Sequence, residues 1–263
     1  MKYTQLFKTF LQRHLAYRAR VTIWAFVDLI NFLIFPFLWL SIYGDRMSIA
    51  GYSRADIVTY YIVIMFISLG FSSHILKQIR TDILNGEING LLLKPISYLY
   101  YRFIHELSYK CIVLLVAVLF FIGADILAPS YIEFPHSWLY ILSFFLSLAC
   151  SYVLSHATQM IVGLSSFWLG ENFGPDRLRH ILEKIFSGEL APLIFLPGIL
   201  QTVAVYLPFK YLSYFPSQLY LEQITLPDAL NNFFVLGIWI IVSWSIVWIM
   251  WKRGLKRYEG VGI

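Results

Sequence analysis

Two groups of polar residues contain residue types that are found in catalytic sites, and their spacing in the sequence is close to the spacing that such sites require. His105 and Glu106 begin a pattern that zinc proteases complete with a second histidine one helical turn later. That position holds Tyr109, so two imidazoles cannot share one face of a helix. Ser165 follows His156 in an apolar stretch, but nine residues place the two side chains on opposite sides of a continuous helix. Neither group therefore predicts catalysis.

Four polar residues in apolar stretches are candidates for lining a substrate path. Asp28 and Asn31 lie one helical turn apart, as do His156 and Gln159, and polar groups inside a membrane are often functional. The alternative is that they form hydrogen bonds between neighbouring helices, or that Asp28 reaches the inner interface. The absence of a chain of acidic residues favours this structural interpretation.

Composition indicates an all-α integral membrane protein with one domain. Of the 263 residues, 59% are hydrophobic and only 13% are charged, which is too little polar surface for a soluble globule. The net charge of +5 is not accompanied by basic and aromatic residues alternating on a polar face, so we expect no nucleic-acid partner. Cys111 and Cys150 lie in apolar runs and indicate neither a disulfide nor a metal site.

The apolar segments predict six transmembrane helices after an amphipathic helix, residues 1–20, in the membrane interface. The fifth is the weakest, because Pro192 and Pro197 interrupt it. Seventeen of the 20 Lys and Arg residues fall on one side when both termini are cytoplasmic, as the positive-inside rule requires. The six predicted spans are residues 21–43, 57–76, 107–123, 138–169, 190–206 and 233–251.

Three polar or broken segments connect these spans. Residues 77–102 form a cytoplasmic loop in which one helix ends at a left-handed Gly86 and a very short helix follows before Pro95. Such a rigid, exposed unit could be pushed by a soluble partner. Residues 176–186 predict a second cytoplasmic amphipathic helix that ends at Ser187 and Gly188. Residues 207–221 predict short helices dipping into the outer leaflet, or an outer loop anchored by tyrosines.

The order of these elements resembles the membrane subunit of type-2 ATP-binding cassette (ABC) exporters. Three stretches are similar to a bacterial permease family that is related to daunorubicin exporters and was first catalogued as a domain of unknown function. They are GEINGLLLKPI at residues 86–96, FSGELAPL with FLP at 186–197, and LPF with YFPSQLY at 207–220. The resemblance covers nearly the whole chain.

This resemblance implies that the loop after the second span is the coupling helix, which docks in a groove of a separate ATPase. Glu87 would be the main polar contact, and Gly86 and Gly90 would permit close approach. The docking residues it implies are Asn85, Gly86, Glu87, Ile88, Asn89, Gly90, Leu91, Leu92 and Leu93.

The resemblance also implies partners and a location. Such permeases act as pairs of identical or paralogous chains in the bacterial inner membrane, and each binds an ATPase subunit that holds ATP and Mg²⁺. The cargo would be a drug-like molecule, a lipid or another amphiphile. No cofactor or enzymatic activity is expected in this chain, which has no GxxxxGK[ST] phosphate loop. The alternatives are a stand-alone intramembrane enzyme or a secondary carrier, and the lack of paired intramembrane charges and of an inverted repeat disfavours the carrier.

Overall fold

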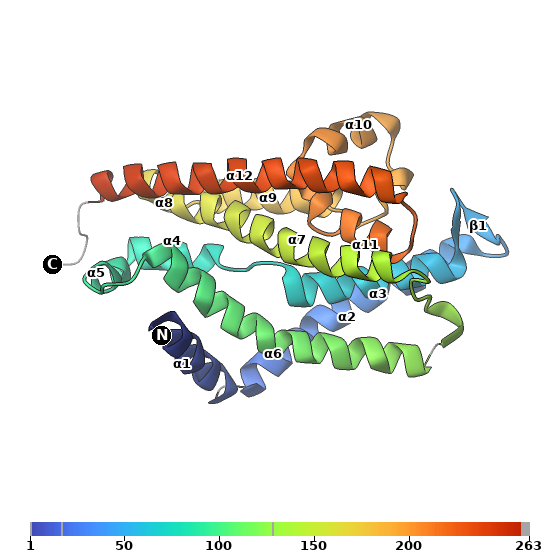
Figure 1. The fold of residues 1–263 in the computed structure, drawn as a ribbon, viewed down its shortest axis with the longest axis horizontal. Helices are drawn as coiled ribbons and strands as arrows, with labels where there is room; N and C mark the ends of the chain where they lie inside the picture. Colours follow the sequence, from blue (N-terminus) through green and yellow to red (C-terminus); the bar gives the residue numbers. More distant parts are fainter. Residues whose placement is uncertain (1, 17, 128, 259–263) are drawn as a thin grey trace.

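The computed structural model describes residues 2–16, 18–127 and 129–258, without the side chains of residues 18, 20–22, 24, 25, 28, 29, 31 and 32. The described chain is an elongated bundle with α5 near one end and the β1–β2 hairpin at the other (Figure 1). Its long helices are α2 (Arg18–Tyr43), α3 (Arg54–Phe71), α6 (Tyr98–Leu127), α7 (Trp138–Leu164) and α12 (Leu226–Arg257).

Shorter elements connect or cover the long helices. The strands β1 (Ser48–Ile49) and β2 (Tyr52–Ser53) pair antiparallel. The short helices are α1 (Lys2–Ala16), α4 (Leu76–Leu84), α5 (Glu87–Leu92), α8 (Ser166–Leu169), α9 (Phe173–Phe186), α10 (Gly198–Tyr206) and α11 (Tyr214–Tyr220), and the 3-10 turns are η1 (Pro129–Tyr131), η2 (Leu193–Phe195) and η3 (Pro208–Tyr211).

Length and composition identify four candidate membrane spans among the described residues. They are Arg54–Leu84, Tyr98–Leu127, Trp138–Leu169 and Leu226–Arg257, and a shorter apolar helix, Leu33–Tyr43, is the end of α2. An all-helical membrane chain is consistent with these findings, but six spans are not confirmed. Helix α6 begins nine residues before the predicted third span, so Glu106 belongs to the same helix as Lys110.

The predicted fifth span, residues 190–206, is not a continuous helix. Around Pro192 and Pro197 the chain forms only η2 and the nine-residue α10, which is about 14 Å long and cannot cross a bilayer core. The prediction of a spanning helix here was therefore wrong. The prolines explain the failure, because they lack the N–H that a helix interior needs.

The helix predicted for residues 176–186 is present as α9, and its place on the cytoplasmic side stays a prediction. Its apolar residues Leu182, Ile185 and Phe186 belong to the same hydrophobic cluster as Leu154 of α7 and Tyr211. The helix ends at the predicted place, because Gly188 is left-handed with φ +85°.

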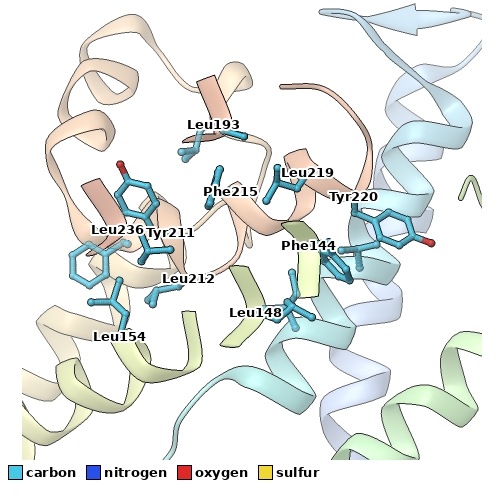
Figure 2. Close-up of a cluster of buried hydrophobic side chains, with 14 of the residues drawn as sticks. Phe144, Leu148, Leu154, Leu193, Tyr211, Leu212, Phe215, Leu219, Tyr220 and Leu236 are labelled. Carbon is cyan, nitrogen blue, oxygen red and sulfur yellow. The ribbon is translucent and has the colours of Figure 1, made fainter. Parts of the chain in front are cut away.

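Residues 207–221 form the short helices η3 and α11, which are packed into the core. Figure 2 shows Leu212, Phe215 and Leu219 among side chains of α7 and α12, and all three are buried. The Ser151 hydroxyl, at the middle of the 27-residue α7, donates to the Tyr211 carbonyl at 2.6 Å. The short helices are thus present as predicted, and their place in the outer leaflet stays a prediction.

Helix α1 lies along the N-terminal half of α6. Phe10 is buried against the rings of Tyr101 and His105, with centroids 5.2 and 4.8 Å away. Lys2, Lys8 and Arg13 are exposed around the rest of the helix. The amphipathic helix is thus present over residues 2–16, and its place in a membrane interface stays a prediction.

Candidate functional site

Helices α4 and α5 form a compact hairpin near one end of the bundle (Figure 1). The turn between them has Gly86 in the left-handed conformation, φ +73°, as the sequence predicted. Ile88 is fully buried and holds α5 against Ile83 and Leu164. The other side of α5 is open, and Leu93, just after it, is 89% exposed. Glu87, Gly90 and Leu92 are exposed as well.

A buried ion pair attaches this hairpin to α6. Arg102 forms an ion pair with Asp82 of α4, its Nε donates to Asp82 Oδ2 at 2.6 Å, and its Nη1 donates to Gln78 at 3.1 Å. The Tyr98 hydroxyl donates to the same carboxylate. The Tyr98 ring also stacks on Trp251 of α12, with centroids 4.8 Å apart. These contacts join α4, α6 and α12 into one unit.

Further contacts attach α4 to α7 and to the start of α9. The buried Arg80 donates to Asn172 Oδ1 at 3.2 Å, and its guanidinium lies 4.4 Å from the centre of the Phe173 ring. A Cβ at Gly163 of α7 would lie 2.9 Å from Ile79 Cβ, so the helices approach closely only because residue 163 is glycine. A displacement of the hairpin must therefore act on four neighbouring helices.

The chain between α3 and α4 is not helical at residues 72–75, and groups from two other helices bind it. The Ser73 hydroxyl donates to Glu106 Oε2 at 2.6 Å, and the His74 N–H donates to Glu106 Oε1. The Ser73 N–H donates to the Ser155 hydroxyl of α7 at 2.9 Å. Lys110 Nζ donates to the Leu69 carbonyl at 2.9 Å. These bonds satisfy backbone groups that the break removes from helical pairing.

His156 is part of this cluster and is not among the residues that line the neighbouring cavity. It is fully buried, with Nδ1 2.7 Å from Glu106 Oε2. The Ser73 hydroxyl is 3.5 Å from the same ring nitrogen and donates to Glu106 instead. A serine nucleophile needs the histidine nitrogen opposite the carboxylate, so serine, histidine and glutamate here have the wrong order for catalysis. Ser165 donates to the Val162 carbonyl.

A cavity of about 550 Å³ lies beside the break and contains one of the four predicted path residues, Gln159. The side chains of Asp28 and Asn31 lie outside the described residues, although Ile34 and Phe35 further along α2 line the cavity. The other lining residues are Ser68, Leu69, Ser72, Ser73, His74, Arg179, His180, Glu183, Lys184, Glu189 and Leu190.

Sequence reasoning missed the charged wall of this cavity. Arg179 of α9 pairs with Glu183 and, at 3.4 Å, with Asp176, while Glu189 accepts from Ser68 at 3.3 Å. The charged face of an amphipathic helix is usually solvent-exposed, so nothing in the sequence indicated that the α9 charges lie beside a cavity. In the part of the chain that is described, no group of three or more His, Cys, Asp or Glu residues could hold a metal ion.

Comparison with known proteins gives one family. The model of a family described as ABC-2 family transporter protein matches residues 29–262. This match includes the α4–α5 hairpin, the break at residues 72–75 and the cavity. No curated protein and no solved structure matches the chain.

Proposed function

The chain belongs to the ABC-2 family of transporter proteins, and from that premise we propose that it is the permease of an exporter driven by a separate ATPase. Permeases of this family are typically non-catalytic membrane subunits. ATP and Mg²⁺ would then be bound by the partner ATPase, because this sequence has no phosphate-binding loop. The conformational change that hydrolysis drives in the partner would have to be transmitted to the membrane helices through direct contact between the two chains.

The observation that carries this proposal is the asymmetry of α5. One side is fixed to the bundle by Ile88, and the other presents Glu87, Gly90 and Leu93 to the surroundings. The exposed side therefore combines two adjacent leucines, Leu92 and Leu93, with the charged Glu87 on a hairpin that is anchored to the bundle, which fits a docking contact with a soluble protein. We assign residues 85–93 as the segment that docks on the ATPase, with Glu87 as its polar contact.

A second permease would complete the transport path. Arg177, His180 and Lys184 are exposed on α9, and Leu178 and Ile181 between them are 59% and 48% exposed. A face that combines exposed apolar and basic side chains fits neither lipid tails nor water alone, and such a face usually meets another protein or a water-filled cavity. We propose that an identical or paralogous permease covers this side, and that an amphiphilic substrate passes between the two. Both termini would be cytoplasmic, in a bacterial inner membrane.

The docking assignment predicts that Glu87→Arg separates the chain from its ATPase. The tagged protein is purified from its native host in mild detergent, and co-purifying ATPase is quantified by mass spectrometry. Reversing a charge at the centre of a small interface should reduce recovery by about tenfold or more. Glu133→Arg, an exposed change in the loop after η1, is the matched control and should retain the ATPase.

Two results would contradict the proposal. Wild-type protein that yields no ATPase, even after crosslinking through residues 85–94, would remove the exporter assignment. Equal recovery of the ATPase with Glu87→Arg and with wild type would be compatible with the exporter assignment, but it would show that Glu87 is not part of the docking surface.

A further inference from the structure

We propose that Glu106 is a positioning residue that links the coupling hairpin to the wall of the cavity, by holding the break between α3 and α4 to α6. This inference rests on the proposed function, since it concerns how motion of the hairpin reaches the transport path. The break has two roles in the fold. Ser72, Ser73 and His74 line the cavity, and α4 begins two residues after His74.

The carboxylate of Glu106 is arranged for such a role. It is 4% exposed and receives the Ser73 hydroxyl, the His74 N–H and a contact from His156 Nδ1. A buried carboxylate is stable only with several donors. Bonds with an ionised partner are about twice as strong as neutral ones, so Glu106 fixes the break more firmly than Ser155 alone would.

The bonds that hold the break come from outside its own helices. Glu106 belongs to α6, while Ser155 and His156 belong to α7. The unwound conformation of residues 72–75 therefore depends on where α6 and α7 lie relative to α3. If motion of the docked hairpin displaces α4, there are two possible responses. Either α6 and α7 move with α4, or the hydrogen bonds to Glu106 break and new ones form. Both responses move the cavity wall at Ser72.

Labelling of Ser72→Cys tests this link, in a chain whose Cys111 and Cys150 are replaced by serine. The rate of modification by a small methanethiosulfonate is measured on the complex with its co-purified ATPase, without nucleotide and with ATP plus vanadate. Nucleotide should change the rate by about fivefold or more, the lower range of allosteric coupling. With Glu106→Gln, ATPase recovery should be unchanged and the nucleotide effect should fall below about twofold.

Control variants separate positioning from stability. His105→Gln changes the neighbouring residue, which faces Phe10 and His14 of α1, and should keep the full nucleotide effect. Ser73→Ala removes one donor to Glu106 and leaves the fold least disturbed, so a partly reduced effect is expected. If nucleotide changes the labelling rate in Glu106→Gln as much as in the wild type, the link is overturned. If Glu106→Gln does not fold, a full nucleotide effect in Ser73→Ala overturns it instead. Loss of the effect with the ATPase still bound supports it, whereas absence of any ATPase would instead overturn the proposed function.

Discussion

Replacing Arg102 with methionine is expected to lower the free energy of unfolding by about 3–5 kcal/mol, because the buried Asp82 carboxylate then loses its ion partner. The side chains of Asp82 and Arg102 are only 2% and 10% exposed. Tyr98 can still donate to Asp82, but one hydroxyl does not replace a charged fork with two donors. The midpoint of thermal unfolding in detergent should fall by roughly 10 °C.

Removing both charges distinguishes an unpaired charge from a general loss of packing. In the double variant Asp82→Leu/Arg102→Met, neither partner is left buried alone, so most of the lost stability should return. Arg253→Met changes an exposed cation at the same end of the bundle and should shift stability by less than about 0.5 kcal/mol. If the double variant melts no higher than Arg102→Met, the buried pair is not what holds α4 to α6.

Local chemistry explains which parts of the fold followed from the sequence. The left-handed turn at Gly86 and the short helix after it depend on residues adjacent in the chain, and both are present. Long apolar runs likewise predicted the helices around residues 57–76, 138–169 and 233–251, since length and composition suffice for this. The broken character of residues 207–221 is present as well, and Pro208 begins η3 as expected, but Pro216 lies inside α11 and the interruption falls before it.

Contacts between distant residues explain what the sequence did not predict. Glu106 meets Ser73 and His156, which are 33 and 50 residues away, and nothing in the local pattern joins the three. A signal was present, because Glu106 and Lys110 lie one turn apart at the start of an apolar run, and ionisable residues there are functional candidates by default. Helix α9 was predicted, but its part in the cavity wall was not, because the charges of an amphipathic helix fit a solvent-exposed face and a cavity wall equally well.

Replacing Gly188 with alanine is expected to lower the free energy of unfolding by about 2–5 kcal/mol, which combines left-handed backbone strain with overpacking. Gly188 has φ +85°, and a Cβ there would overlap the Tyr60 hydroxyl and press on Tyr214. The same hydroxyl donates to the Gly188 carbonyl at 2.7 Å. Because this residue ends α9 beside the charged cavity wall, its displacement should also disturb Glu189 and its bond from Ser68.

The matched position Gly51 separates these two causes. Its φ of +87° is nearly that of Gly188, but nothing lies within 4 Å of a Cβ there, so Gly51→Ala should cost only the strain, about 1–2 kcal/mol. Tyr60→Phe removes the overlapping hydroxyl and loses about 1 kcal/mol with its hydrogen bond. In that background, Gly188→Ala should cost less than in the wild type and approach the Gly51→Ala value. An equal cost in both backgrounds would show that close approach of Tyr60 is not why residue 188 is glycine.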